Sequence, residues 1–119
     1  MTPKPPTRVE LLRGTLDLLI LRTLLPGPSH GHAIAKHIQQ TSEELLQVET
    51  GSLYPALHRL EKQGWVRTEW RQTEANQRAK YYSLTPAGKK QLTEEHARWK
   101  QMVQAIGNIM DTAPAKGQS

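Results

Sequence analysis

Hydrophobic residues follow a helical pattern along much of this chain, and the first segment with that pattern is 9–25. Its sequence, VELLRGTLDLLILRTLL, places apolar residues around most of a helical circumference, and Pro26 and Pro28 close it. A helix that is apolar on nearly all sides is buried on more than one side. We therefore expect this first helix to pack on its own core with one side and on a partner subunit with the other.

Two shorter amphipathic helices are predicted next. In the segment 31–41, which follows Ser29, alanines and isoleucines can face inward while lysine, histidine and glutamine face outward. The third helix ends before Gly64 and repeats leucines at positions i, i+4 and i+7. Its predicted inward residues are Leu53, Leu57 and Leu60.

The start of the third helix is complicated by Pro55. Thr50 or Ser52 can provide the N-cap, because hydroxyl side chains accept hydrogen bonds from the first amides of a helix. Proline has no amide hydrogen and is tolerated only near a helix start. We therefore expect an irregular first turn, or a helix that begins nearer Ser52.

A strand-like alternation replaces the helical period after residue 64. Segments 65–71 and 78–85 alternate bulky and polar residues on either side of the polar stretch 73–77. Together they predict a β-hairpin. Tyr81 and Tyr82 point to opposite faces of its second strand, so one of the two is expected in the core.

A long final helix is predicted from Pro86 to Met110, with Thr85 as its N-cap. Residues spaced alternately by four and three along it form a heptad seam with one polar member, and such a seam favours packing on another helix. We therefore predict a homodimer interface built from this seam and the first helix. The predicted interface residues are Leu12, Leu16, Leu19, Leu92, His96, Trp99, Val103, Ile106 and Met110.

These elements predict a fold that is mainly α with a small β-hairpin, namely a winged helix-turn-helix followed by a C-terminal dimerisation helix. The expected division is a flexible N-terminal tail over 1–8 and a DNA-binding domain over 9–85. The dimerisation helix follows over 86–110, and a flexible tail over 111–119. The tails are assigned from their proline-rich or small and polar composition.

Composition adds three constraints to this picture. A chain of 119 residues with 36% hydrophobic content and no phenylalanine can bury one modest core, which favours a dimer. The absence of cysteine excludes disulfides and thiolate metal sites. The N-terminus lacks a secretory pattern and no apolar run is long enough to span a bilayer, so we expect a cytoplasmic protein without membrane association.

Charge points to a polyanionic partner. Sixteen Lys and Arg against 11 Asp and Glu give +5 and a pI near 9.7, and six of those cations fall between residues 50 and 80 beside three acids. The polar face of the third helix can reach base edges and phosphates, and the hairpin can lie along the backbone or enter a minor groove. The predicted contacts to double-stranded DNA are Ser52, Tyr54, Pro55, His58, Arg59, Lys62, Arg71, Arg78, Lys80 and Tyr81.

Three separated motifs resemble the PadR family of bacterial transcriptional regulators. They are LLRGTLDLLILRTL at 11–24, GSLYPALHRLEKQGW at 51–65 and AKYYSLTPAG at 79–88. The resemblance covers 9–110 and is strongest to the short members with a single C-terminal helix, of the type common in acidobacteria. It implies a winged-helix domain, dimerisation through the C-terminal helix packed with the first helix, and usually repression of a nearby gene.

The resemblance also assigns roles by position. Tyr54, Pro55, His58 and Arg59 match the family's recognition-helix face, and Arg78, Lys80 and Tyr81 match its wing. Trp99 matches an interface tryptophan that stacks flat aromatic ligands in drug-sensing relatives, which makes it the candidate contact for a small-molecule effector. Polar Glu94, Glu95 and His96 depart from those relatives, so the resemblance does not decide whether a ligand pocket is present. Because these residues are polar or acidic, we expect any effector to be cationic or planar aromatic.

Other classes of function have less support. No catalytic constellation, phosphate-binding loop or regular metal-ligand spacing is present, so we expect no enzyme activity, no cofactor and no metal, although His30, His32 and His37 lie close in sequence. The alternative is a winged-helix protein-interaction module without sequence-specific DNA binding, because one fold hosts many functions.

Overall fold

A computed structural model describes residues 13–112. Its elements are α1 (Arg13–Thr23), β1 (Ser29–His30), α2 (Gly31–Thr41), α3 (Thr50–Lys62), β2 (Val66–Gln72), β3 (Arg78–Leu84) and α4 (Pro86–Met110). The predicted fold class is confirmed, because four helices accompany a small antiparallel sheet in the described residues. No helix in this range is long and apolar enough to cross a membrane.

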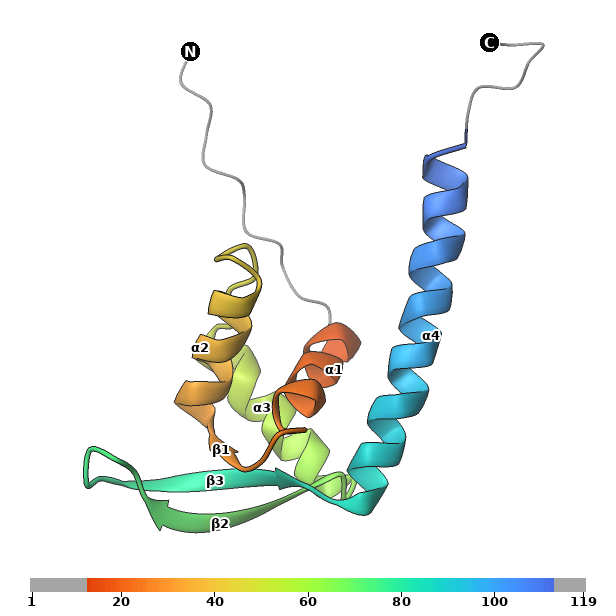
Figure 1. The fold of residues 1–119 in the computed structure, drawn as a ribbon. Helices are drawn as coiled ribbons and strands as arrows, with labels where there is room; N and C mark the ends of the chain where they lie inside the picture. Colours follow the sequence, from red (N-terminus) through yellow and green to blue (C-terminus); the bar gives the residue numbers. More distant parts are fainter. Residues whose placement is uncertain (1–12, 113–119) are drawn as a thin grey trace, which may run out of the picture.

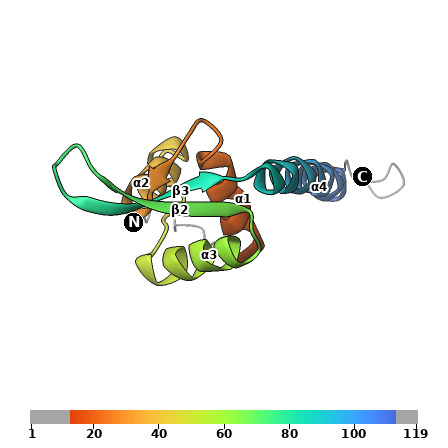
Figure 2. The same cartoon turned by 90° about the horizontal axis from the view of Figure 1, so that it is seen from below.

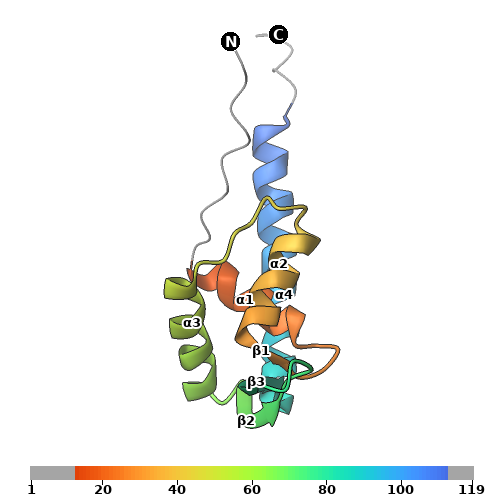
Figure 3. The same cartoon turned by 90° about the vertical axis from the view of Figure 1, so that its left-hand side faces the viewer.

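The helices and the hairpin lie in two layers. Helices α1, α2 and α3 sit on one side of the sheet, and α4 rises from one end of the sheet while the tip of the β2–β3 hairpin points to the opposite end (Figure 1). Seen from below, α2 and α3 flank the hairpin on its two sides (Figure 2). Helix α3 stands at one flank of the helical layer with its outer side facing away from α1 and α2 (Figure 3).

One apolar core joins the first three helices, the sheet and the start of α4. On α1, Leu16, Ile20 and Leu21 are buried, as is Leu24 directly after the helix, whereas Leu19 is only partly buried. The remaining buried apolar residues are Ile34, Ile38, Leu53, Ala56, Leu57, Leu60, Val66, Tyr82, Leu84 and Leu92. The predicted inward leucines of α3 are therefore confirmed, and Tyr82 is the one of the two hairpin tyrosines that lies in the core. Residues 9–12, including Leu12, lie outside the described residues.

The sheet has a strand that the sequence analysis did not anticipate. Ser29 and His30 form β1, which pairs with Tyr82 and Tyr81 of β3, so the strand order is β1-β3-β2. Imidazole Nδ1 of His30 also accepts a hydrogen bond from the amide of Ala33 at 3.3 Å and caps α2. This two-residue strand ties the start of α2 to the wing.

The third helix begins differently from the prediction and ends as predicted. Glu49 is the N-cap without a side-chain hydrogen bond, so neither Thr50 nor Ser52 caps the helix, and Pro55 lies in its second turn. At the other end Gly64 has φ +77, which favours glycine. The amides of Gly64 and Trp65 donate to the carbonyls of Glu61 and Leu60, a Schellman motif that turns the chain into β2.

The junction between wing and α4 is built around Thr85, as predicted. Its Oγ1 accepts from the amide of Gly88 at 3.0 Å and donates to the carbonyl of Gly64 at 2.6 Å, and its own amide donates to the carbonyl of Trp65 at 3.0 Å. The end of α3 and the start of α4 are therefore held by the same residue.

Candidate nucleic-acid interface

The outer face of α3 is polar and accessible. Its leucines and Ala56 are buried, and the residues between them project outward because a helix repeats every 3.6 residues. The predicted contact residues that the structure leaves exposed on this helix are Ser52, Tyr54, Pro55, His58 and Lys62. The helix therefore presents donors, acceptors, an aromatic ring and a cation on one side.

Tyr54 is only partly accessible because it also packs on the start of α2. It is 46% exposed, and a Cβ built on Gly31 would lie 2.7 Å from the Tyr54 hydroxyl oxygen. The absence of a side chain at Gly31 therefore lets the ring approach the α2 backbone. Tyr54 fixes α2 against α3 and keeps about half of its surface available.

Arg59 departs from its predicted outward position. Its guanidinium turns toward α1, where Nη2 donates to Asp17 at 2.8 Å, and its side chain is 26% exposed. Buried Nε has no hydrogen-bond partner among the described residues. The helical pattern could not reveal this, because Asp17 is 42 positions away in the sequence. A phosphate contact from Arg59 stays a prediction.

Two of the three predicted wing cations already have carboxylate partners. Arg71 pairs with Glu69 and lies over the Tyr81 ring, with Cζ 5.3 Å from the ring centroid. Lys80 is 3.7 Å from a carboxylate oxygen of Glu61 on α3. These exposed pairs are weak individually, but they orient the two side chains.

Arg78 is held differently. Its guanidinium carbon lies 5.3 Å from the centroid of the Trp70 ring, and no ion pair to it occurs in the described part of the chain. Trp70 itself is 57% exposed. Trp70 was not among the predicted contacts, although its alternation with Val66 and Thr68 places it on the helix-facing side of β2, just beyond the end of the core.

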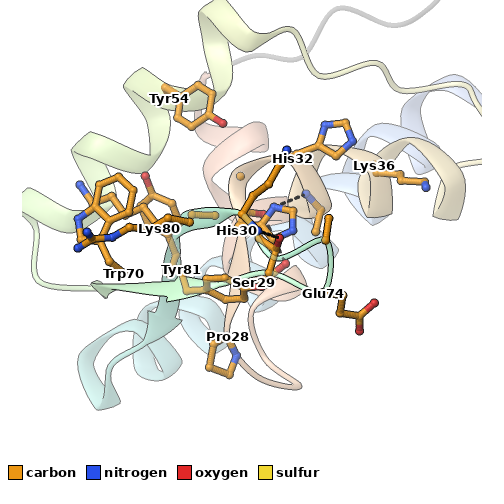
Figure 4. Close-up of a pocket in the computed structure, with 18 residues that line it drawn as sticks. Pro28, Ser29, His30, His32, Lys36, Tyr54, Trp70, Glu74, Lys80 and Tyr81 are labelled. Atoms are coloured by element: carbon orange, nitrogen blue, oxygen red, sulfur yellow. Dashed lines mark hydrogen bonds between the residues drawn. The ribbon is translucent and has the colours of Figure 1, made fainter.

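An open groove of about 1190 Å³ runs between the start of α2, Tyr54 and the wing. Figure 4 places Tyr54 across from Trp70, whereas the His30 ring lies against that of Tyr81, with ring centroids 5.3 Å apart. Three cations and one acid line it, namely Lys36, Arg78, Lys80 and Glu74. The groove is therefore positive and aromatic, which suits a polyanion.

Tyr82 forms the buried floor beneath this surface. Burial raises the pKa of its phenol, and the neighbouring Tyr54 and Glu61 raise it further. The hydroxyl therefore stays neutral at physiological pH.

Within the described residues, no three histidine or carboxylate side chains come together in a way that could hold a metal ion.

The predicted interface seam on α4 divides into two parts. Leu92 is buried against the core, as is Leu16 of α1, so these two residues already pack within a single chain and are not available as predicted. His96 is exposed and its ring centroid lies 6.3 Å from that of Trp99. Farther along the helix, the exposed seam residues are Trp99, Val103, Ile106 and Met110.

Comparisons with known proteins agree on one family. The model of the "Transcriptional regulator PadR-like family" matches residues 20–94. A transcriptional regulator from Mycobacterium tuberculosis is 32% identical over 97 residues, which cover 82% of this chain and 87% of the relative.

Solved structures give the same result. A PadR family transcriptional regulator from Eggerthella lenta is 33% identical with a TM-score of 0.72, over 85% of this chain and 86% of its own. A transcriptional regulator from Clostridium thermocellum is 33% identical with a TM-score of 0.74, over 81% of this chain and 93% of its own.

Proposed function

The chain belongs to the PadR-like family of transcriptional regulators, and we propose that it acts as a homodimer that binds a pseudo-palindromic DNA operator and represses transcription. Its function is regulatory and not enzymatic. In this proposal residues 9–85 form the DNA-binding domain and 86–110 the dimerisation helix. The repressor role comes from the family resemblance.

The observation that carries DNA binding is the exposed polar face of α3 beside the basic groove of the wing. The width of a major groove admits an α-helix, and phosphate contacts from Lys and Arg position it. Lys62 on α3 and Arg78 on the wing both have exposed side chains without an ion pair in the described residues. With α3 in the major groove, the wing reaches the adjacent backbone and minor groove.

The observation that supports a homodimer is the apolar stripe of α4. Trp99, Val103 and Ile106 are each about half exposed in a single chain, at 46%, 48% and 51%. The stripe continues the face on which Leu92 packs against the core. A second copy would cover it, since heptad spacing favours helix pairing. Such a dimer would place the two α3 helices about 34–36 Å apart, in successive major grooves.

Lys62→Ala should weaken operator binding and reduce its salt dependence. A removed phosphate contact lowers the slope of log affinity against log salt by about one per subunit. The measurement is fluorescence anisotropy with a duplex from the region upstream of the gene, titrated at several salt concentrations. Lys90→Ala, an exposed lysine on α4, is the matched control and should keep the wild-type slope.

The same titration separates DNA binding from the alternative function. A winged-helix protein-interaction module would bind specific and scrambled duplexes equally. An unchanged slope for Lys62→Ala, with a sequence preference still present in the wild type, would remove Lys62 from the interface and leave the rest of the proposal standing.

An effector site is proposed at Trp99. The ring is partly accessible and lies beside His96, which is compatible with a planar aromatic or cationic compound between the α4 helices. Such a compound would lower DNA affinity only by its differential affinity for the two dimer geometries.

A further inference from the structure

The hairpin carries one stacked pair that the proposed function does not yet use. Trp70 on β2 and Arg78 on β3 are diagonal neighbours, since Trp70 pairs with Lys80 and Gln72 with Arg78 in the strand register. The Arg78 guanidinium lies over the indole ring. Both side chains are exposed and line the groove that faces α2 and α3.

Trp70 and Arg78 are exposed because the hydrophobic core ends before it reaches them. Val66, Tyr82 and Leu84 share the same sheet face and are buried under the helices. Toward the hairpin tip the helices no longer cover this face, so an indole sits largely in water. A 57% exposed tryptophan without a core role is a feature of binding surfaces more than of stability.

The charges of the wing single out Arg78. Lys80 is paired with Glu61, and Arg71 is paired with Glu69 and lies on Tyr81, on the opposite sheet face. Arg78 has the indole as its partner and no carboxylate within ion-pair distance among the described residues. Stacking limits the rotamers of the guanidinium without neutralising it, so less entropy is lost when it binds.

We propose that Trp70 is a positioning residue that holds Arg78 for insertion into the minor groove next to each half-site, where Arg78 reads groove width. This inference rests on the proposed DNA binding. With α3 in the major groove of the DNA, the sugar-phosphate backbone between the major and minor grooves would cross the positive protein groove between Tyr54 and the wing. Arg78, near the hairpin tip, would then lie beyond that backbone, at the minor groove. Narrow minor grooves of A·T tracts attract arginine through their enhanced negative potential.

The test uses duplexes whose core is the consensus selected by the wild-type protein from a randomised library. Only the base pairs flanking each half-site are changed, to A·T or to G·C tracts. The wild type should prefer the A·T flanks by about tenfold, the size of one good base-level contact. Trp70→Ala should reduce this ratio to about twofold or less while the salt slope stays that of the wild type, because the charge remains.

Two further variants separate positioning from charge and from folding. Arg78→Lys keeps the charge but lacks the planar guanidinium, so it should lose the flank preference. Trp70→Phe keeps an aromatic ring for Arg78 to stack on and should retain most of the flank preference. Arg98→Lys is the same exchange on α4, outside the proposed interface, and should change nothing. Melting temperatures should be unaltered in all four variants, because the substituted residues are exposed.

The possible results are distinct. A flank ratio that stays at the wild-type value in Trp70→Ala and Arg78→Lys would overturn the inference and make Arg78 an ordinary phosphate contact. Equal binding of both flanks by the wild type would overturn it as well, with operator binding intact. If the wild type selects no sequence from the library, the proposed function fails and this inference fails with it.

Discussion

Ile106→Asp should convert the protein to a monomer and lower operator affinity by at least about 100-fold. Ile106 is 51% exposed in the single chain and lies near the middle of the uncovered part of the stripe. A carboxylate buried at an interface without a partner costs about 3 kcal/mol or more per site, and a two-fold dimer would contain it twice. Sedimentation velocity over a range of concentrations measures the assembly, and anisotropy measures DNA binding.

Gln104→Asp is the matched control for this prediction. It adds the same charge to the same helix, but Gln104 is exposed and lies outside the seam, about 100° around the helix from Val103. It should remain dimeric. Secondary structure should be unchanged in both variants, because neither residue belongs to the core. A dimeric Ile106→Asp protein would place the subunit contact elsewhere and contradict the proposed use of α4.

Much of the fold could be predicted because local signals agreed with the tertiary structure. Thr85 followed by Pro86 marks the start of α4, and Gly64 marks the end of α3; both depend on interactions within a few residues. The alternation in the hairpin also predicted that one of Tyr81 and Tyr82 lies in the core, and it is Tyr82. Such features depend on residues that are close in the sequence, so a sequence pattern can predict them.

The failures concern contacts between distant segments. β1 is two residues long and exists because Ser29 and His30 pair with β3, more than fifty positions later. Thr50 or Ser52 was predicted as the N-cap of α3, but Glu49 occupies that position without a side-chain hydrogen bond. Burial of Leu16 and Leu92 within one chain follows from the packing of α4 on α1, which no local pattern reveals.

The candidate interface was affected in the same way. Except for Arg59, periodicity correctly identified the exposed residues of α3. It could not distinguish cations that are free to meet phosphate from cations engaged within the chain. Arg59 turns to Asp17, and Lys80 to Glu61, across separate elements. Trp70 was overlooked because a tryptophan in an alternating strand usually belongs to the core, and only the limited extent of the helical layer leaves it exposed.

Gly88→Ala should lower the melting temperature by roughly 10–20 °C, the second large effect that we expect. A Cβ at this position would lie 2.0 Å from the carbonyl oxygen of Trp65, which is backbone and accepts the amide of Thr85. To relieve this steric clash, α4 must move away from the end of α3, and this movement breaks the hydrogen bonds around Thr85. Overpacking against backbone of this kind costs about 3 kcal/mol.

Gly51→Ala is the control, because it lies in α3 with no atom within 4 Å of the added Cβ. It should be neutral or stabilising by up to about 1 kcal/mol, since alanine is the better helix former. Thermal unfolding followed by circular dichroism distinguishes the two variants, and a wild-type melting temperature for Gly88→Ala would contradict the tight junction.

The same junction should also affect DNA binding. Thr85 joins the end of α3 to the start of α4, so in the proposed dimer it sets the spacing of the two recognition helices. Gly88→Ala protein that is still folded at low temperature should therefore bind the operator more weakly than the wild type while remaining dimeric, because its α4 seam is intact but the direction from the seam to α3 has changed.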